Sequence, residues 1–329
     1  MKEKNRYLND FHIGKYFAGI LIAAYLCLLP AGLCGQTAWY RRGSFFDIST
    51  IKALFAWDSH RAIAAGNGGT IILCLDGGKE WHSLSIRDKR AIDFKDIFFI
   101  NADTGWVVGD FGQILKTENR ARDWKLLYSD LETNLMTVRF FDIMNGIAAG
   151  NRNNEAVIFH TADGGETWSE QTFGNTNCFC DIAIVSEDIA YAAGNYGVIY
   201  KTTDRGDSWN PLNSGTLTNI SDLFFLNAST GWAVGGLGLI LKTTDSGKTW
   251  IIQSGETVEP LFSVCFTDPV HGWAAGDNGT LIFTGNGGKS WTHYPTRTRQ
   301  CLVAVQFPKQ RTGWVISSMG MVFRTLIPE

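Results

Sequence analysis

A short motif that ends in tryptophan recurs six times in the sequence, as CLDGGKEW (74–81), TENRARDW (117–124), TADGGETW (161–168), TTDRGDSW (202–209), TTDSGKTW (243–250) and TGNGGKSW (284–291). Its tryptophans are 43, 44, 41, 41 and 41 residues apart. A second block precedes most copies, as in TGWVVGDFGQILK from Thr104 and TGWAVGGLGLILK from Thr230. A period near 41 residues with several short apolar runs per unit is typical of a β-propeller, in which each unit forms one blade.

One repeat can be divided into four strands. Short runs rich in Val, Ile, Phe and Trp, separated by Gly, Asn and Asp, favour strands over helices. In the unit that ends at Trp250, this pattern predicts strands at residues 222–226, 231–235, 239–243 and 250–252. The fold is therefore expected to be all-β.

The two ends of the chain decide the number of blades. Residues 301–325 supply three strands and no further motif, whereas residues 39–42 look like the end of a motif with nothing before it. If this early strand completes the last blade, the ring closes without a free edge. We therefore predict that residues 36–329 form a seven-bladed β-propeller of four-stranded antiparallel blades, with the last blade closed by the N-terminal strand.

The residues of the motif have structural roles in this fold. The Asp side chain can accept hydrogen bonds from backbone N–H groups two residues on, and the Gly two places later permits positive φ. Ala121 stands in for this Gly in the second copy and is expected to weaken that turn. The tryptophans are expected to pack between neighbouring blades. The structural set comprises Asp76, Asn119, Asp163, Asp204, Asp245 and Asn286 with Trp39, Trp81, Trp124, Trp168, Trp209, Trp250 and Trp291.

The motif does not predict catalysis. A catalytic group would not recur in six places around a ring, and we expect no catalytic residue in it. Lys248 follows Ser-Gly as in a phosphate-binding loop, but the GxxxxGK[ST] spacing and the helix that should follow it are missing.

The N-terminal segment differs from the rest of the chain. Four basic residues precede an apolar run over residues 17–29, which is followed by Pro30 and a stretch of small residues that ends at Gly35. This order predicts a signal peptide over residues 1–35, cleaved before Gln36, with an uncleaved membrane anchor as the alternative. We expect an exported protein that is periplasmic, extracellular or associated with the outer membrane, or one tethered by this segment.

Charge and cysteine content exclude further classes. Residues 1–35 hold four Lys/Arg and two Asp/Glu, so their removal moves the formal net charge from −3 to −5. An acidic chain of this kind is not expected to bind nucleic acid. Five cysteines follow residue 36 and form neither a CxxC nor a CxxH pair, so we expect buried or unpaired thiols and predict no metal site and no cofactor. They are Cys74, Cys178, Cys180, Cys265 and Cys301.

The pattern [S/T]xDxGxTW with an upstream GWxxG strand is the Asp-box, also called the bacterial neuraminidase repeat. With a box in nearly every blade, residues 37–329 resemble the photosystem II stability/assembly factor family of plants and cyanobacteria. The resemblance implies a seven-bladed binding platform that acts during assembly of the photosystem II reaction centre, and thus a link to photosynthesis. We therefore expect an exported, monomeric, non-catalytic platform that assists the assembly or stability of a membrane or envelope complex.

A carbohydrate-active propeller, either a sialidase-like glycoside hydrolase or a lectin, is the alternative. Sialidases share the box, but on a six-bladed ring. Their FR[IL]P motif near the start is missing here, and FRTLIP from Phe323 lies at the wrong end. Glycosidases need two carboxylates about 5–10 Å apart, and spacing in the sequence singles out no such pair.

Basic residues gather in three connections between blades. In a propeller of this order, the connections from each outer strand to the next inner strand share one face of the ring, and the Asp-boxes lie on the other. The connections into the first, second and seventh blades are neighbours and carry Arg41, Arg42, Arg87, Lys89, Arg90, Arg297 and Arg299. The remaining connections carry Asp130, Glu132, Glu170, Glu256 and Glu259.

This one-sided distribution predicts a basic patch. Arginine forms planar, bidentate contacts with carboxylates, and a one-sided field steers a partner of opposite charge. We therefore expect these seven residues to bind a protein partner with an acidic surface, such as a subunit of a membrane complex. Ordinary solvated loop charges are the alternative. The resemblance supports the patch, because the family carries an arginine-rich surface.

Overall fold

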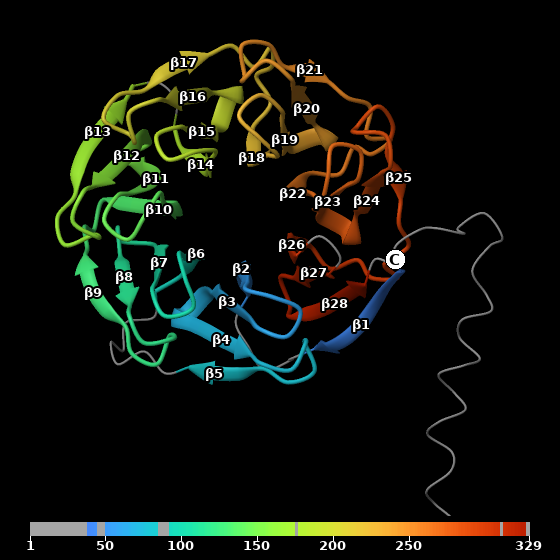
Figure 1. Ribbon diagram of the computed structural model, residues 1–329, viewed down its shortest axis with the longest axis horizontal. Coiled ribbons are helices and arrows are strands. Elements are labelled where there is room, and N and C mark those ends of the chain that lie inside the picture. The colour runs from blue at the N-terminus through green and yellow to red at the C-terminus, as the bar shows by residue number, and fades with distance from the viewer. Residues whose placement is uncertain (1–37, 45–49, 85–91, 175–176, 310–311, 327–329) are drawn as a thin grey trace, which may run out of the picture. The chain divides into compact units, whose positions relative to one another are not determined.

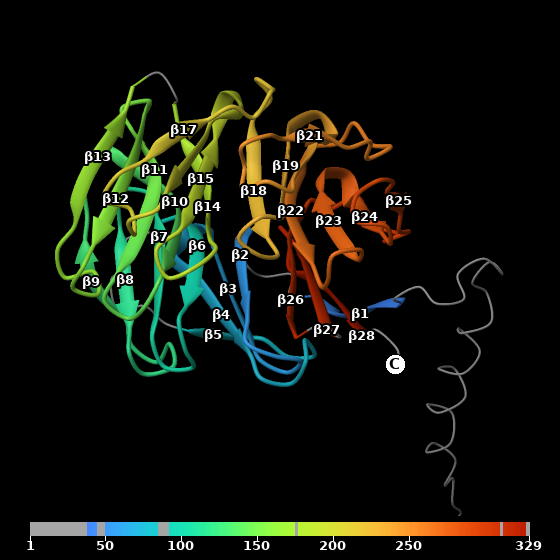
Figure 2. The same ribbon diagram turned by 45° about the horizontal axis from the view of Figure 1, so that its top comes forward.

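The computed structural model describes residues 38–44, 50–84, 92–174, 177–309 and 312–326. These residues form seven four-stranded antiparallel sheets arranged around a central axis (Figure 1). The prediction of an all-β, seven-bladed propeller is therefore confirmed. In each blade the first strand lies nearest the axis and the fourth lies on the outside; Figure 2 shows the first strands β2, β18 and β26 running along the axis.

The first four blades follow one another along the chain. Blade 1 contains β2 (Ile51–Ala56), β3 (Ala62–Gly66), β4 (Thr70–Cys74) and β5 (His82–Leu84). Blade 2 contains β6 (Phe94–Phe99), β7 (Gly105–Gly109), β8 (Ile114–Thr117) and β9 (Lys125–Tyr128). Blade 3 contains β10 (Thr133–Phe140), β11 (Gly146–Arg152), β12 (Glu155–Thr161) and β13 (Ser169–Phe173). Blade 4 contains β14 (Phe179–Ile184), β15 (Ala190–Gly194), β16 (Ile199–Thr202) and β17 (Asn210–Leu212).

The last three blades complete the ring. Blade 5 contains β18 (Ile220–Phe225), β19 (Gly231–Gly235), β20 (Ile240–Thr243) and β21 (Ile251–Ile252). Blade 6 contains β22 (Leu261–Phe266), β23 (Gly272–Gly276), β24 (Leu281–Thr284) and β25 (Thr292–His293). Blade 7 contains β26 (Leu302–Lys309), β27 (Thr312–Ser317), β28 (Met321–Leu326) and β1 (Ala38–Ser44). Short 3-10 turns join the second and third strands in four blades, as η1 (Asn67–Gly69), η2 (Asn195–Gly197), η3 (Gly236–Gly238) and η4 (Asp277–Gly279).

The N-terminal strand closes the last blade. Strand β1 pairs antiparallel with β28, with Trp39 opposite Thr325 and Arg41 opposite Phe323 (Figure 1). The last blade is thus built from both ends of the described chain, as predicted. Because β1 supplies the outer strand that the C-terminal segment lacks, β28 is left with no open edge.

The hydrophobic core lies between the blades. Most second strands begin with a Gly-Trp pair, and both residues of this pair are needed for packing in the core. A Cβ on Gly272 would lie 2.5 Å from the ring of Phe266, so only glycine leaves room for this ring within blade 6. The ring in turn stacks on Trp232 of blade 5, with centroids 3.5 Å apart, and Trp291 of the box packs against it edge-on at 5.8 Å. The same arrangement recurs as Trp106–Phe140–Trp168 and as Tyr191–Phe225–Trp250.

The turns between second and third strands contain a residue with positive φ. Blades 1 and 6 place Gly68 (φ 66°) and Asn278 (φ 51°) there, which are the residue types that tolerate this conformation. Blade 5 instead has Leu237, with φ 54° and an exposed side chain. A leucine in this conformation is strained and buries little apolar area in return.

We expect Leu237→Asn to raise the free energy of unfolding by up to about 1 kcal/mol, because asparagine relieves part of this strain. Urea denaturation followed by tryptophan fluorescence measures the change. The reciprocal variant Asn278→Leu is the control and should lose stability by a similar amount. A loss of stability in Leu237→Asn would contradict the interpretation.

Candidate functional site

The ring has two faces that are built from different connections. The turn after β7 contacts the connection between blades 2 and 3, where the Asp130 N–H donates to the carbonyl of Phe111 (2.8 Å). The box of blade 1 contacts the loop between β2 and β3, where the Gly77 N–H donates to the carbonyl of His60 (2.9 Å). We call the side with the blade-to-blade connections the link face, and the side with the Asp-boxes the box face.

The Asp-box is a closed network of short hydrogen bonds. In blade 3, Thr161 Oγ1 donates to Asp163 Oδ1 (2.8 Å) and accepts from the Gly165 N–H (2.9 Å). Asp163 also accepts from the N–H of Thr167 (2.9 Å) and from its hydroxyl (2.6 Å). The donating backbone group is therefore four residues on, and the expectation of two residues was wrong. Gly165 takes φ 95° inside this turn, in the left-handed region expected for the glycine of the box.

These bonds set the charge state of the box. The hydroxyl and N–H of Thr167 lower the pKa of Asp163 to about 2, and Thr249 does the same for Asp245. A carboxyl group with such a low pKa is ionised near neutral pH, where it accepts hydrogen bonds and cannot donate a proton.

The boxes in which Asn replaces Asp, or Cys replaces Thr, form a similar hydrogen-bond network. Asn119 and Asn286 each accept from the N–H four residues on, at 3.0 Å. In blade 1, Cys74 takes the place of threonine, and its Sγ donates to Asp76 Oδ1 (3.2 Å). Ala121 adopts φ 63°, a conformation in which its Cβ is strained. The boxes of blades 4 and 5, with Asp204 and Asp245, repeat the blade 3 network.

Each box tryptophan lies in an apolar cluster formed by its own blade and a neighbouring blade. Trp39, which occupies the box position of blade 7, packs edge-on against Trp273 of blade 6 with centroids 5.3 Å apart. Trp81 lies in the cluster between blades 7 and 1, where it contacts Trp314. The others lie between blades 1 and 2, 2 and 3, 3 and 4, 4 and 5, and 5 and 6, as Trp124, Trp168, Trp209, Trp250 and Trp291.

The structure places three of the seven predicted basic residues. Arg297 and Arg299 are exposed in the connection between blades 6 and 7, on the link face. This connection is held by Thr296, whose Oγ1 donates to the carbonyl of Gly279 in η4 (2.8 Å). Arg41 is exposed, but it lies within β1, the outer strand of blade 7, and not in the connection into blade 1 as expected. The side chain of Arg42 and all of Arg87, Lys89 and Arg90 lie outside the described residues, so the patch as a whole stays a prediction.

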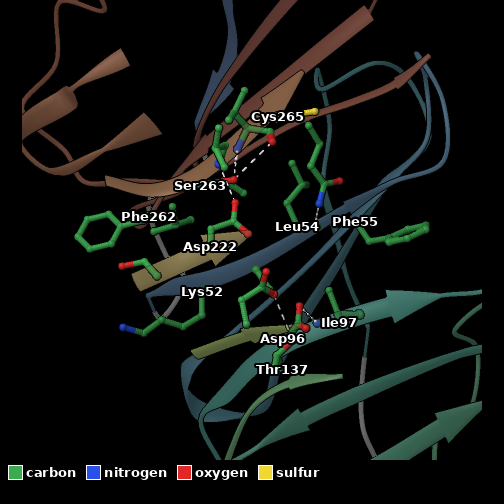
Figure 3. Close-up of a pocket in the computed structure, with 18 of the residues that line it drawn as sticks. Lys52, Leu54, Phe55, Asp96, Ile97, Thr137, Asp222, Phe262, Ser263 and Cys265 are labelled. Carbon is green, nitrogen blue, oxygen red and sulfur yellow. Dashed lines mark hydrogen bonds between the residues drawn. The ribbon is translucent and has the colours of Figure 1, made fainter. Parts of the chain in front are cut away.

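The inner strands of all seven blades line a central cavity of about 410 Å³ (Figure 3). Equivalent positions of five inner strands carry polar side chains, which are Asp96, Thr137, Asp181, Asp222 and Ser263. Figure 3 shows four of them around the cavity, Asp96, Thr137, Asp222 and Ser263.

These side chains join several pairs of neighbouring blades. Asp96 Oδ2 accepts from the Val138 N–H (3.0 Å), Asp181 Oδ2 from the Leu223 N–H (3.0 Å) and Asp222 Oδ2 from the Val264 N–H (2.6 Å). Ser263 Oγ accepts from the Val305 N–H (3.2 Å) in the same way. An inner strand has no neighbour on the axis side, so its free N–H groups need such acceptors.

Arg139 is the cation of this cluster. Its guanidinium forms an ion pair with Asp96, another with Asp181 Oδ1 at 3.3 Å, and lies 5.8 Å from the centre of the Phe98 ring. Burial lowers the pKa of Arg139, but the two carboxylates outweigh burial and raise it. Burial also raises the pKa of Asp181 and of Asp222, and the neighbouring Asp181 carboxylate raises that of Asp222 further.

The residues around Arg139 in the central cavity, namely Asp96, Asp181 and Asp222, form what we call the channel cluster, and none of them was predicted from the sequence. Asp96, Asp181 and Asp222 occupy the same position of their repeats, so aligning the repeats would have shown the column of acidic residues. The acids could pass for a glycosidase pair, but both oxygens of Asp222 accept backbone N–H groups, from Leu223 and Val264. This bonding fits a structural role better than proton transfer to a substrate.

The described part of the chain contains no group of three or more His, Cys, Asp or Glu side chains arranged to hold a metal ion. No helix among these residues is long and apolar enough to span a membrane.

Comparisons with known proteins agree with this architecture. A structure described as YCF48 bound to D1 peptide has 19% sequence identity and a TM-score of 0.71, over 89% of this chain and 97% of that chain. YCF48 from Cyanidioschyzon merolae has 18% identity and a TM-score of 0.73, over 88% and 99%. A GH74 xyloglucanase from Xanthomonas campestris has 13% identity and a TM-score of 0.65, over 87% and 53%. At these identities the likeness shows the fold alone.

Sequence comparison identifies the family. No curated protein matches the chain. The family model described as photosynthesis system II assembly factor YCF48 matches residues 46–118 and 117–217, which is more than half of the chain. The chain therefore belongs to the family of the photosynthesis system II assembly factor YCF48.

Proposed function

We propose that this protein is an exported, non-catalytic platform of the YCF48 type, which binds a subunit of a membrane complex and assists the assembly or stability of that complex. Family membership carries the proposal. A relative of the same fold has been solved with a D1 peptide bound, which supports a protein ligand for this chain too. For the YCF48 family the complex is photosystem II, and export rests on the predicted signal peptide over residues 1–35.

The proposed binding surface is the basic part of the link face. Arg297 and Arg299 are exposed there, on a connection that the Thr296 hydrogen bond holds to η4, so little loop ordering is needed on binding. Arg297 has φ 57°, and the Gln300 N–H donates to Thr298 Oγ1 (3.1 Å) beside it. Exposed guanidinium groups on such a support suit carboxylates of a partner.

The charge reversal Arg297→Glu with Arg299→Glu is expected to abolish capture of an acidic peptide or subunit in a pull-down, because attraction becomes repulsion. The matched control reverses Lys79 and Lys248, which are exposed on the box face, and changes the net charge equally. Capture should be retained in this control. Unchanged capture by the arginine variant would remove this surface from the proposal.

The carbohydrate-active alternative gains no support from the channel. Its acids are bound to backbone N–H groups of neighbouring blades, and the xyloglucanase shares only the fold. Cleavage of any substrate in a panel of fluorogenic glycosides would support the carbohydrate-active alternative.

A further inference from the structure

Exposed apolar side chains stand at strained turn positions of the link face. The position of Gly68 and Asn278 is taken by Tyr196 in η2 and by Leu237 in η3, with φ values of 57° and 54°. Their side chains are 52% and 78% exposed. Neither the backbone conformation nor burial accounts for a large apolar residue at these two turns.

Each of these turns is fastened to a connection that carries a second exposed apolar residue. The Tyr196 N–H donates to Asn219 Oδ1 (2.9 Å), and Leu217 in the same connection is 83% exposed. Gly238 of η3 comes so close to Thr257 that a Cβ would lie 2.0 Å from its carbonyl oxygen, and the next residue, Val258, is 78% exposed. We call Tyr196, Leu217, Leu237 and Val258 the apolar arc.

Local hydrogen bonds hold the tips of the arc in place. The Thr218 N–H donates to Thr216 Oγ1 (3.0 Å), and the Glu259 N–H donates to Thr257 Oγ1 (3.1 Å). Leu217 and Val258 lie at the centres of these two turns. The apolar side chains are thus presented on a fixed backbone, on neighbouring blades and on one face, which is the arrangement of a preorganised docking surface.

The apolar arc ends at blade 6, where polar residues occupy the positions equivalent to Leu237 and Val258. These two positions hold Asn278 and Arg299. The apolar arc is therefore separate from the basic residues on which the proposed function rests.

Carboxylates border the arc. Glu256 is exposed, Glu259 accepts a hydrogen bond from Asn278 Nδ2 (3.3 Å), and Asp277 lies in η4. None of the three forms a salt bridge with another described residue. Carboxylates without an ion-pair partner at this end of the arc repel an anionic bilayer and attract basic groups.

From this combination we infer that the apolar arc docks an amphipathic protein segment with one apolar and one basic side. The apolar side would cover Leu217, Leu237 and Val258, and the basic side would meet Glu256 and Glu259. The inference goes beyond the proposed function, because it uses a different surface and a ligand of opposite charge.

The test uses the full chain and a fluorescein-labelled helical peptide of leucine and lysine, spaced to give one apolar and one basic side. Fluorescence anisotropy should show binding that is at least about tenfold weaker for a scrambled peptide of the same composition. The variant Leu217→Ser, Leu237→Asn, Val258→Ser should weaken binding at least about tenfold, and Glu256→Lys with Glu259→Lys should also weaken it.

Two controls separate this surface from others. Ile251→Thr with Ile252→Thr removes exposed apolar side chains from outer strand β21 and should leave the affinity unchanged. Arg297→Glu with Arg299→Glu should not weaken binding of the peptide, although the same change should abolish capture of an acidic partner. The two proposals therefore fail independently.

Four results would overturn the inference. The first is no binding of the leucine–lysine peptide. The second is binding by the triple variant as tight as by the parent chain, and the third is binding of a leucine–glutamate peptide as tight as that of the leucine–lysine peptide. The fourth is uptake of the parent chain, but not of the triple variant, by vesicles of phosphatidylcholine and phosphatidylglycerol, which would make a bilayer the occupant.

Discussion

The substitution Phe266→Ala is expected to lower the free energy of unfolding by about 3–5 kcal/mol, because it leaves a cavity between two blades. The ring is 4% exposed and lies between Trp232, which it stacks on, and Trp291, which meets it edge-on. Urea denaturation followed by far-ultraviolet circular dichroism measures the loss.

The control for this prediction is Ile252→Ala, which truncates an exposed side chain of β21. Its free energy of unfolding should stay within about 0.5 kcal/mol of the parent. If Phe266→Ala cost less than about 1 kcal/mol, the neighbouring blades would have to collapse onto the gap, and the rigid stack described above would be wrong.

Arg139→Met is expected to destabilise the protein by about 3–5 kcal/mol at neutral pH. The methionine keeps much of the volume of the side chain but leaves the carboxylates of Asp96 and Asp181 without their cation. A buried carboxylate that loses its partner is a large source of instability. The same denaturation experiment measures the loss, and Arg205→Met, which removes two exposed ion pairs on the box face, is the matched control.

The pH dependence of this loss has a defined sign. Burial raises the pKa of Asp181 and Asp222 in the folded protein above the unfolded value, so the folded state binds their protons more tightly. Stability from these groups is present in full below the unfolded pKa and is lost as the pH rises through the folded pKa. Removing Arg139 raises the folded pKa of Asp181 further, because its cation stabilised the charged form.

The deficit of Arg139→Met should therefore be small in mild acid and grow towards neutral pH. The Asp-box carboxylates do not change the stability between mild acid and neutral pH. The pKa values of Asp163 and Asp245 are lowered to about 2, so their contribution is present above the unfolded pKa and is lost only as the pH falls through the folded value. A deficit that is the same at every pH would show that Arg139 acts through packing alone.

Much of the fold could be predicted from the sequence because it is a repeat. The strand expected at residues 231–235 is β19 (Gly231–Gly235), and that expected at 239–243 is β20 (Ile240–Thr243). A unit that recurs every 41 residues must bury its apolar faces against copies of itself, so its period predicts the neighbours of each blade. Trp39 resembles the last residue of a motif whose earlier part is missing, and this predicted the strand that closes blade 7.

The site was harder to predict for geometric reasons. Asp222 and Arg139 are 83 positions apart in the sequence and in different blades, and they approach each other only because all inner strands converge on one axis. The apolar arc follows the repeat, since Leu237 lies 41 positions after Tyr196 and Val258 lies 41 positions after Leu217, but this spacing does not show that the side chains stay exposed. Their common exposure follows from the turn conformations and not from residue type.

The sequence by itself determined that the chain is all-β, that its unit repeats near every 41 residues, and that the Asp-box is a structural turn. These properties depend on residues close together in the chain, whose hydrogen bonds and spacing are local. The tertiary structure alone decided which charges meet in the channel and which apolar side chains remain exposed on the link face. Both depend on the closure of the seven-bladed ring, which brings together residues that the sequence keeps far apart.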